Sequence, residues 1–580
     1  MTAVGPDAID NLHAADALLG AFMELGLRRL VLCPGSRSAP LALAALRRES
    51  QGLRLFTAID ERSAAFFGLG LARANGEPVA VVTTSGTAVA HLLAAAVEAD
   101  RSTLPLLLIS ADRPERLKNC GANQTVNQEA FLQPVCRALL QGPMAGLHKA
   151  SADRLRNLAD LAWRLCVGVP AGPVHLNLAF EEPLHASAIT PSPEAPIPRI
   201  TAVELEPPAP IDPAVLDPDR PGLIVVGPWR RGAGATFVGA LQRLVQRTAW
   251  PVLVDVASGL RGLPLPLVSG YDLLLADPSL VPPVDQVLRL GPMPASRRLQ
   301  QWLQTLGQIP QFVITEQEPR RLDPLASGAP QDWGGLARWV NSLPQGEASL
   351  AARQMQAQWL EAEEKLQRHL DQKLPLKGPC TEPALARWCN RLLPPDWPVL
   401  LANSSPVRDW ESYGARLEAQ RTVVSFRGAS GIDGCLSLAA GLAAEWGRLV
   451  LVCGDLALLH DSNGWLWRQQ LKGRLLVLLI DNGGGGIFEQ LSMPRENLDF
   501  ERLFAMPQSV DPLALAAAHG VPGKNCNSLE QLPAALAWMV SDEQAREPML
   551  LLRLQTDRAA DAQLRRQLRS SGWEVGLGDS

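Results

Sequence analysis

The stretch LLVLLIDNGGGG, residues 475–486, places six apolar residues directly before Asp481, Asn482 and four consecutive glycines. A short apolar run of this kind is typical of a strand that is buried on both faces of a parallel sheet. A flexible linker is the alternative interpretation of the glycines, but a core strand does not usually lead into a linker. The stretch therefore favours a backbone kept bare so that a bulky, charged group can lie against it.

A second apolar strand of the same kind ends at Asp455. It is formed by RLVLVCG, residues 448–454, and Asn482 follows Asp455 by 27 residues. The stretch between the two strands includes HDSNGWLWRQQLKG, residues 460–473, which is long enough for one crossover helix. We therefore expect two neighbouring parallel strands, with Asp455 and Asn482 at the carboxyl edge where open α/β sheets bind ligands.

The side chains at this edge are suited to a hard metal ion. A carboxylate from Asp455, an amide oxygen from Asn482 and a nearby backbone carbonyl are oxygen ligands of the kind that Mg²⁺ prefers, and phosphate oxygens and water complete its shell. The glycines would let a diphosphate accept bonds from backbone N–H groups. The alternative is structural: Asp455 caps the following helix and Asn-Gly forms a plain turn.

The alternation of apolar runs and helical stretches extends over two long parts of the chain. Helical stretches such as GTAVAHLLAAAVEA, residues 86–99, separate the runs. This βαβ pattern predicts buried parallel strands. The expected strands are 28–33, 53–59, 79–84 and 104–110 in the first part, and 397–403, 421–426, 448–454, 474–480 and 548–554 in the last.

The middle of the chain has a different texture. A proline-rich stretch, 186–221, is typical of an extended linker. Apolar runs at 222–227, 251–255 and 311–316 then indicate a middle α/β domain, and the helix-prone stretch 348–372 leads into the last part. We therefore predict an α/β protein of three domains, each a mainly parallel sheet flanked by helices. Their limits are 1–185, 186–375 and 376–580, and the first and third resemble each other.

Composition excludes several classes of protein. The net charge of −5 over 580 residues gives no basic field for nucleic acid or an anionic membrane. No apolar run approaches the roughly 20 residues of a membrane helix, and we see no signal peptide at the N-terminus. The nine cysteines form no CxxC pair, which argues against a zinc ribbon or a disulfide framework. We expect a soluble cytoplasmic protein.

The two strand ends resemble a known fingerprint. GDL at 454–456 and DNGGGGIF at 481–488 are similar to the thiamine-diphosphate motif, which begins with Gly-Asp and ends with Asn. Leu456 stands where the motif has a glycine, and Gly483 stands where it has a second Asn. The resemblance implies thiamine diphosphate as cofactor, with Mg²⁺ or Mn²⁺ held by Asp455, Asn482 and the carbonyl of Gly484.

A thiamine enzyme also needs a carboxylate for the aminopyrimidine ring. The stretch LFTAIDERSAAFF, residues 55–67, offers Glu61 after an early strand. By resemblance, Glu61 hydrogen-bonds N1′ and favours the tautomer that deprotonates the thiazolium carbon. Such a carboxyl must be sheltered from water and have a raised pKa. Alternatively, Asp60, Glu61 and Arg62 are a solvated helix start with a favourable charge–dipole arrangement.

Further motifs resemble one family within the thiamine enzymes. CPGSRSAPLALA (33–44), TTSGTAV (83–89), ISADRPERLKNCGANQTVNQ (109–128) and FRGASGIDGCLSLAAG (426–441) are similar to the MenD family, the 2-succinyl-5-enolpyruvyl-6-hydroxy-3-cyclohexene-1-carboxylate synthases. The resemblance covers both catalytic domains and is weaker in the middle domain. It implies a transferase that decarboxylates 2-oxoglutarate and adds the resulting succinic-semialdehyde carbanion to isochorismate in a 1,4 sense, in menaquinone or phylloquinone biosynthesis.

Both of these substrates are dicarboxylates, so a site for them needs fixed guanidinium groups. With 54 Lys and Arg in the chain, the alternative for any single arginine is a surface ion pair. A surface ion pair is the weakest explanation for Arg37, because PGSRS follows a strand and opens a helix. The N–H groups at the start of that helix, together with Ser36, could bind an anion. Arg297 is a looser match, and Arg298 is the alternative to it. The other substrate candidates by motif position are Arg113, Asn123, Gln124, Ser404, Arg408 and Arg427, while Ser85 and Gly86 are candidates for cofactor binding.

Apolar residues near the motifs complete the set. By resemblance, Ile432 lies beneath the cofactor and holds it bent, which brings its reacting groups together. Ile487, Phe488 and Leu491 follow the glycines at helical spacing and could wall the substrate cavity, although core packing is the first interpretation of such a pattern. Many relatives have a larger residue at Gly486, so we expect the four glycines to loosen the loop.

The resemblance also implies a partner and leaves rivals open. In this superfamily the cofactor bridges two chains, so we expect a homodimer or a pair of dimers. Another thiamine-dependent 2-oxo-acid decarboxylase or an acetolactate synthase is the first rival. The middle segment VVGPWRRGAGATF, residues 225–237, lacks GxGxxG and gives weak support to a flavin site. A catalytically inactive binding protein is the second rival.

Overall fold

The computed structural model describes residues 7–186, 212–228, 234–491 and 498–570. The chain forms two compact units. The first comprises Met1–Leu205, Phe426–Gly447 and His460–Gly473, and the second comprises Glu206–Ser425, Arg448–Leu459 and Arg474–Ser580. No helix among the described residues combines the length and apolar character needed to cross a membrane.

The first unit is built on a six-stranded parallel sheet of order β2-β1-β3-β4-β6-β5. The strand cores are apolar and fully buried, as parallel sheets covered on both faces require. The four predicted strands are confirmed, while β5 and β6 were not predicted. The bounds are β1 (Arg29–Leu32), β2 (Arg54–Thr57), β3 (Val79–Thr83), β4 (Leu106–Asp112), β5 (Leu139–Gln141) and β6 (Pro173–Ala179).

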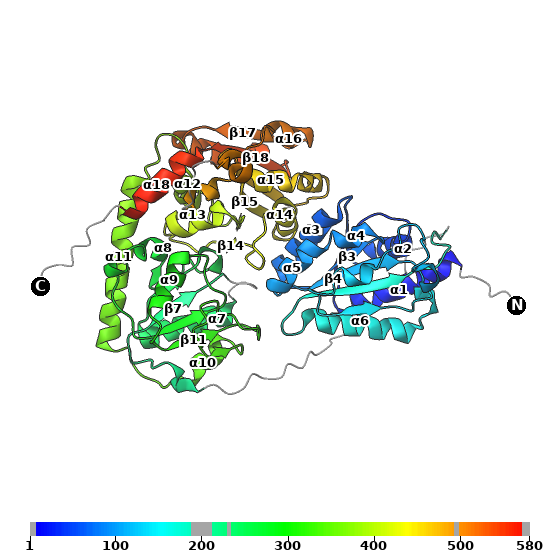
Figure 1. Ribbon diagram of the computed structural model, residues 1–580, viewed down its shortest axis with the longest axis horizontal. Coiled ribbons are helices and arrows are strands. Elements are labelled where there is room, and N and C mark those ends of the chain that lie inside the picture. Colours follow the sequence, from blue (N-terminus) through cyan, green and yellow to red (C-terminus); the bar gives the residue numbers. More distant parts are fainter. Residues whose placement is uncertain (1–6, 187–211, 229–233, 492–497, 571–580) are drawn as a thin grey trace, which may run out of the picture. The chain divides into compact units, whose positions relative to one another are not determined.

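Helices cover both faces of this sheet (Figure 1). One face packs against α1 (Ala8–Leu25), α2 (Ala39–Glu49) and α6 (Ala152–Val167). The other carries α3 (Glu61–Asn75), against which α14 (Cys435–Trp446) packs. Glycine permits this close approach, since a Cβ at Gly70 would lie 2.3 Å from the Leu438 carbonyl oxygen.

The helix predicted over 86–99 is wrong as a single element. It is divided into α4 (Thr87–Ala90) and α5 (Leu93–Arg101). Gly86 begins this segment with a φ of +88°, and a turn at His91 and Leu92 separates the two helices. Leu92 is fully buried. The sequence pattern did not reveal the break because small apolar residues continue through it.

The second unit contains two further six-stranded parallel sheets. Their orders are β12-β11-β10-β7-β8-β9 and β14-β13-β15-β16-β18-β17. The first has β7 (Leu223–Val226), β8 (Val252–Val254), β9 (Leu267–Val268), β10 (Val287–Leu290), β11 (Gln311–Ile314) and β12 (Gln331–Asp332). The second has β13 (Val399–Leu401), β14 (Val423–Val424), β15 (Arg448–Gly454), β16 (Arg474–Asp481), β17 (Gly523–Cys526) and β18 (Met549–Gln555).

The long helix predicted over 348–372 is confirmed as α11 (Leu350–Lys373). Its buried residues include Met355, Trp359 and Leu366, which recur at helical spacing and join a core shared with strands of both sheets. The remaining α-helices of this unit are α7 (Ala235–Thr248), α8 (Tyr271–Leu274), α9 (Arg297–Thr305), α10 (Leu336–Ser342), α12 (Glu382–Leu392), α13 (Ser405–Tyr413), α15 (Asp455–His460), α16 (Pro512–Ala518), α17 (Leu532–Val540) and α18 (Arg558–Ser570).

The first and last sheets share one topology, because β13–β18 are ordered as β1–β6 are. In each sheet the order in which strands are added reverses between two neighbouring parallel strands, β1 and β3 or β13 and β15. A parallel sheet binds ligands at such a point, beyond the carboxyl ends of its strands. The predicted likeness of these two segments is confirmed.

Each sheet falls within one of the three segments predicted from the sequence. We retain the limits 1–185, 186–375 and 376–580 as a proposal. The proline-rich linker falls largely outside the described residues, since 187–211 are not among them. The single crossover helix expected over 460–473 is wrong, because α15 ends at His460 and a 3₁₀ stretch, Ser462–Gln469, follows.

Candidate active site

The predicted pairing of the two motif strands is confirmed. β15 and β16 run parallel, with Gly454 opposite Ile480, so Asp455 and Asn482 both follow the same edge of the sheet. Asp455 opens α15 directly, and the N–H of Gly484 donates a hydrogen bond of 2.7 Å to its Oδ2. Asp455 and Gly484 are 29 residues apart in the sequence, and the pairing of the two strands brings them together.

The Asp455 carboxylate is largely buried and lies near other negative charges. Burial, together with the negative charges of Asp481 and Glu382, raises the pKa of Asp455 to about 6. The N–H groups of Leu456 and Gly484 oppose this shift through their hydrogen bonds. Because acidic groups surround the carboxylate, a cation bound there would relieve their repulsion.

Asn482 presents one satisfied end and one unsatisfied end. Its Nδ2 donates a hydrogen bond of 2.7 Å to Glu382 Oε1, while its Oδ1 is buried without a hydrogen-bond partner. A buried carbonyl oxygen of this kind is unusual in a folded protein unless a ligand binds it. The donor set of Asp455, Asn482 and the Gly484 carbonyl therefore fits Mg²⁺ or Mn²⁺. Among the described residues, no three His, Cys, Asp or Glu side chains form a group that could hold a metal ion.

The glycines form a tightly packed turn, and the expectation that they loosen the loop stays a prediction. A Cβ at Gly484, which has a φ of +128°, would lie 2.2 Å from the Ala505 carbonyl oxygen. A Cβ at Gly486 would lie 2.4 Å from Asn482 Nδ2. Only Gly483 of the four is exposed. The absence of side chains thus serves close packing on one side and leaves bare backbone on the other.

The residues after the glycines belong to a 3₁₀ turn, Gly486–Gln490. Ile487 and Phe488 are half-buried, and the Phe488 ring lies edge-on to Phe504 with centroids 5.7 Å apart. Leu491 exposes 49% of its surface, so core packing does not explain it. These three side chains remain candidates for a cavity wall.

Glu61 begins α3 in the first unit and is half-buried. Asp60 caps the helix by accepting hydrogen bonds from the N–H groups of Arg62 and Ser63, and Asn463 donates 2.9 Å to its other oxygen. Burial and the charge of Glu61 raise the pKa of the Cys33 thiol, which places Glu61 beside the end of β1. The start of α3 is therefore held by the hydrogen bonds of Asp60, both within the helix and to Asn463.

A cavity of about 350 Å³ adjoins this helix start. Its walls include Pro34, Thr57, Asp60 and Trp467, and Glu61 stands between two of the lining residues in the sequence. The volume suits a small-molecule ligand or part of a larger one. Ile59 in this wall exposes 76% of its surface.

The motifs after β3 and β4 meet around one arginine. Arg113 Nη1 donates to the Ser85 hydroxyl and, over 2.9 Å, to the Gln124 carbonyl. Gln124 Nε2 in turn donates 2.7 Å to the Ser85 carbonyl, and Gln128 binds the N–H of Gly86. Burial and the charge of nearby Arg37 lower the pKa of Arg113. Two guanidinium groups that repel each other in this way attract an anion.

Arg37 is buried at the start of α2. Its Nη1 donates 2.8 Å to the Phe180 carbonyl and its Nη2 donates 3.0 Å to Glu182, whose side chain is 68% exposed. Its Nε is buried without a partner. Ser36 and Asn123 are exposed. The arrangement leaves Arg37 with a carboxylate neighbour that a ligand carboxylate can replace.

The loop that carries Arg427 and Ile432 is held by a carboxylate that the sequence analysis missed. Glu98 on α5 is 4% exposed and accepts hydrogen bonds from the N–H groups of residues 428–430, at 2.9, 2.6 and 3.4 Å. Arg427 is half-buried, and Ile432 exposes 36% of its surface. An exposed isoleucine next to a fixed loop suits contact with a ligand.

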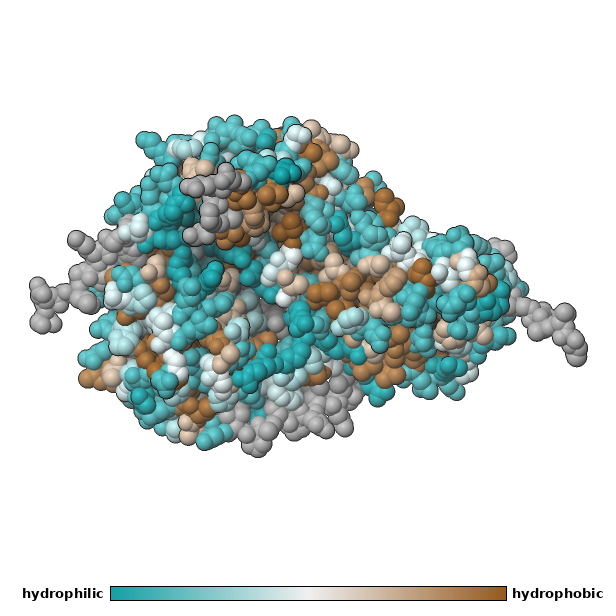
Figure 2. Space-filling model, viewed as in Figure 1, coloured by the Kyte–Doolittle hydropathy of each residue, from teal (hydrophilic) through white to brown (hydrophobic). Residues whose placement is uncertain are grey.

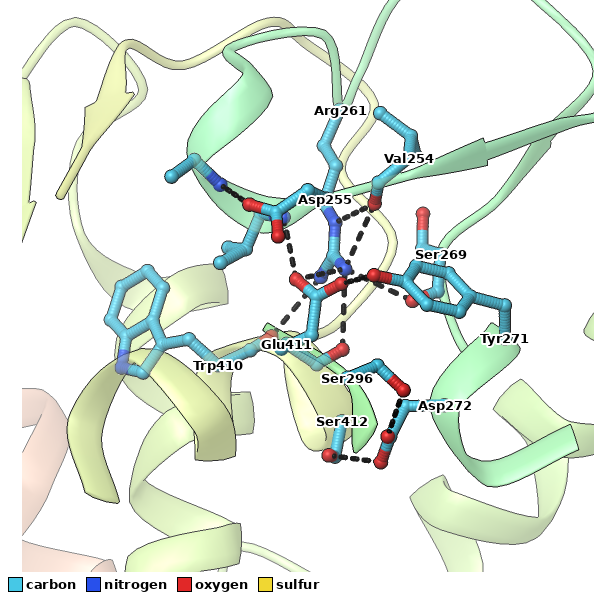
Figure 3. Close-up of polar contacts among 12 residues, drawn as sticks. Val254, Asp255, Arg261, Ser269, Tyr271, Asp272, Ser296, Trp410, Glu411 and Ser412 are labelled. Atoms are coloured by element: carbon cyan, nitrogen blue, oxygen red, sulfur yellow. Dashed lines mark hydrogen bonds and ion pairs between the residues drawn. The ribbon is translucent and has the colours of Figure 1, made fainter. Parts of the chain in front are cut away.

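Helix α13 carries Ser404 and Arg408 at its N-terminal end. Ser404 has a φ of +72°, and Arg408 Nη1 donates 2.6 Å to its carbonyl. Figure 3 shows how the C-terminal end of α13 is anchored: Arg261 donates to the Trp410 carbonyl and to Glu411, which also accepts from the Tyr271 hydroxyl. Burial raises the pKa of Glu411 to about 8. The buried cluster thus holds the C-terminal end of α13, at the opposite end of the helix from Ser404.

The structure separates the two candidate arginines of α9. Arg297 is exposed, whereas Arg298 pairs with Asp272. Asp272 also accepts hydrogen bonds from Ser296 and Ser412 (Figure 3). Arg298 therefore belongs to a structural network, and Arg297 stays available for a ligand.

Three family models match the chain. They are the thiamine pyrophosphate enzyme, N-terminal TPP binding domain, over residues 12–131; the middle domain of thiamine pyrophosphate, over 218–399; and the thiamine pyrophosphate enzyme, C-terminal TPP binding domain, over 410–551. The first model covers β1–β4, the second covers all of β7–β12, and the third covers β14–β17 and the start of β18.

Similar proteins carry one name. The chain is 65% identical over 568 residues to the 2-succinyl-5-enolpyruvyl-6-hydroxy-3-cyclohexene-1-carboxylate synthase of Synechococcus sp. (strain RCC307), with 98% of each chain covered. It is 54% identical to that of Parasynechococcus marenigrum (strain WH8102), over 94% of this chain and 98% of the relative. The chain therefore belongs to the thiamine pyrophosphate enzymes and, within them, to the 2-succinyl-5-enolpyruvyl-6-hydroxy-3-cyclohexene-1-carboxylate synthase family.

Proposed function

We infer that the chain decarboxylates 2-oxoglutarate and transfers the remaining succinyl unit by 1,4-addition to isochorismate, which gives 2-succinyl-5-enolpyruvyl-6-hydroxy-3-cyclohexene-1-carboxylate and CO₂. The observation that carries this inference is the buried, unpartnered oxygen of Asn482, two residues before the glycine that binds Asp455. This arrangement fits a metal-bound diphosphate, and the 65% identical relative carries the corresponding name. Because the reaction transfers the succinyl unit of one substrate to another, we propose that the enzyme is a transferase.

Thiamine diphosphate, when bound, would supply an electron sink for the electron pair that stays on the former 2-oxo carbon as the neighbouring carboxylate leaves as CO₂. The chain's own residues bind and orient it. We propose that Glu61 holds and returns a proton at N1′ of the aminopyrimidine, and that Asp455, Asn482 and the Gly484 carbonyl hold Mg²⁺ or Mn²⁺. The exposed backbone of Gly483 would face the diphosphate. Gly454 and Leu456 flank the metal carboxylate, and Ile432, Ile487 and Phe488 would line the cofactor.

The arginines account for the charge of the substrates. Arg37 and Arg113, whose charges already repel each other, would bind one substrate carboxylate in place of Glu182. Ser36, Asn123 and Gln124 would add neutral hydrogen bonds to the substrate, and Ser85 and Gly86 would contact the cofactor. Arg408 with Ser404, and Arg427 on the loop that Glu98 holds, would bind the remaining carboxylates, and Leu491 would close the apolar side of the cavity.

We propose a homodimer, or a pair of dimers, in which Glu61 of one chain and Asp455 of the partner subunit serve one cofactor. Exposed apolar side chains next to the Glu61 helix support a covered surface: Ile59 is 76% and Leu466 37% exposed. Figure 2 shows hydrophobic areas on an otherwise mainly hydrophilic surface. We further propose a cytoplasmic enzyme of menaquinone or phylloquinone biosynthesis.

The proposal is tested by the loss of isochorismate absorbance with 2-oxoglutarate, thiamine diphosphate and Mg²⁺. We expect isochorismate to be consumed only when all three additions are present, and omission of any one to abolish consumption. CO₂ release from pyruvate without isochorismate consumption would instead assign the chain to another thiamine-dependent decarboxylase or to an acetolactate synthase. Absence of turnover with every substrate would contradict an enzymatic role.

The two arginines of α9 give a sharper test of the substrate site. We expect Arg297→Gln to raise the KM for one of the two substrates about 10-fold or more, since a charge-assisted hydrogen bond contributes roughly 1.5–3 kcal/mol. Arg298→Gln is the matched control, because it breaks the ion pair with Asp272 and should lower the melting temperature with little change in KM. A KM effect confined to Arg298→Gln would reverse the assignment.

A further inference from the structure

Glu382 occupies a special place behind the candidate metal site. It is the first residue of α12, Thr381 caps that helix, and its side chain is 2% exposed. Its Oε1 accepts 2.7 Å from Asn482 Nδ2, across 100 residues of sequence. Its Oε2 accepts 2.6 Å from Arg565 Nη2. Each carboxylate oxygen therefore has a fixed donor.

The contact decides which end of the Asn482 amide faces away from Glu382. An ionised carboxylate accepts hydrogen bonds but donates none, whereas an amide has one donor end and one acceptor end. The pairing of Glu382 with Arg565 therefore leaves Oε1 able to bind only the amide nitrogen. Asn482 Oδ1 is left on the opposite side, where it is buried and unpartnered.

We propose that Glu382 is a positioning residue that orients the Asn482 amide so that its oxygen, and not its nitrogen, is offered to the divalent metal. This proposal rests on the proposed cofactor site. A metal binds an amide through its oxygen, so the reverse orientation removes one ligand. Residues that orient metal ligands in this way typically change metal affinity by about 10–100-fold when they are replaced.

The ion pair between Glu382 and Arg565 could contribute to stability alone. A substitution of Asp409 distinguishes this role from the orientation of Asn482. Asp409 on α13 also pairs with Arg565, and its oxygens accept hydrogen bonds of 2.9 and 2.6 Å from the guanidinium. Its side chain makes no described hydrogen bond to Asn482. Asp409 also hydrogen-bonds to Glu382. Asp409→Asn therefore changes the other carboxyl group on the same arginine, while the Glu382 carboxylate that accepts from Asn482 stays in place.

Glu382→Gln has a defined consequence at Asn482. Because Arg565 offers only donors, we expect the glutamine to turn its carbonyl oxygen to Arg565 and its NH₂ to Asn482. Asn482 then turns its own oxygen to Gln and its nitrogen to the metal. The double variant Glu382→Gln with Asn482→Asp restores a donor–acceptor pair, because the glutamine NH₂ can donate to one carboxylate oxygen while the other faces the metal.

The test measures Mn²⁺ affinity of the full-length protein in the presence of thiamine diphosphate, by electron paramagnetic resonance of free Mn²⁺. We expect Glu382→Gln to weaken Mn²⁺ binding about 10–100-fold, Asp409→Asn to leave it within about 2-fold of wild type, and the double variant to recover most of the loss. The melting temperature of each variant without metal gives its stability separately. If Glu382→Gln does not fold, the double variant against Asn482→Asp alone tests the same pairing.

The outcomes distinguish this inference from the proposed function. Failure of the wild-type protein to bind Mn²⁺ with thiamine diphosphate would overturn the cofactor site itself. Wild-type binding together with unchanged affinity in Glu382→Gln, or an equal loss in Asp409→Asn, would overturn the role of Glu382 alone. A double variant no better than Asn482→Asp would also overturn it.

Discussion

Glu61→Gln is expected to lower the rate of isochorismate consumption by about 10²–10⁴-fold, the range typical of a positioned acid–base group. Glutamine keeps the shape of the side chain at the start of α3 but cannot exchange a proton with the aminopyrimidine. The helix itself should be preserved, because its cap is Asp60 and not Glu61. The measurement is the rate of absorbance loss at saturating 2-oxoglutarate, thiamine diphosphate and Mg²⁺.

Retained cofactor binding separates loss of chemistry from loss of structure. Thiamine diphosphate with Mg²⁺ should still raise the melting temperature of Glu61→Gln, because the metal ligands lie in other motifs. Glu77→Gln is the matched control: this carboxylate follows the end of α3, pairs with Arg29 and is 54% exposed. Activity of Glu61→Gln within 2-fold of that control would show that Glu61 is not the acid–base group.

Most strands of the first and last sheets, and the pairing of β15 with β16, could be predicted from the sequence because local patterns indicate them. The apolar runs that become β15 and β16 are bounded by Asp455 and by Asn482 with its glycines, so strand, edge and ligand type are visible together. Strands without a pure apolar run were missed. β6, PVHLNLA, carries buried His175 and Asn177. His175 Nε2 bonds to Ser110 and the Asn177 amide nitrogen donates to Asp112, and no local pattern shows these contacts.

The residues that hold the candidate site in place, Glu382 and Glu98, could not be predicted from the sequence for a different reason. Glu382 and Glu98 are helix residues whose partners lie 100 and about 330 residues away, and each looks like an ordinary solvated acid in the sequence. Glu98 even falls within a stretch that was predicted as one helix. Their role follows from donors that the fold brings to them, such as Asn482 Nδ2 and the N–H of Gly428. Only tertiary structure supplies that information.

Asp455→Asn is expected to weaken Mg²⁺ and Mn²⁺ binding by more than the roughly 10–100-fold that follows from changing a residue behind a ligand. The substitution removes the negative charge. It also introduces an NH₂ group where both carboxylate oxygens now accept N–H bonds, from Leu456 and Gly484. The amide cannot accept both bonds, so the turn of glycines should lose part of its anchor. Activity should fall in parallel, since the diphosphate is held through the metal.

Asp481→Asn is the matched control for this prediction. Asp481 lies at the end of β16, beside the same sheet edge, and its carboxylate pairs with Arg553 over 2.6 Å instead of belonging to the donor set. Titration of both variants with Mn²⁺ in the presence of thiamine diphosphate should show a large loss for Asp455→Asn and a small change for Asp481→Asn. In the wild type, a chelator should abolish activity and excess Mg²⁺ or Mn²⁺ should restore it. Equal affinities in the two variants would mean that the charge of the sheet edge as a whole, and not the Asp455 side chain, holds the metal.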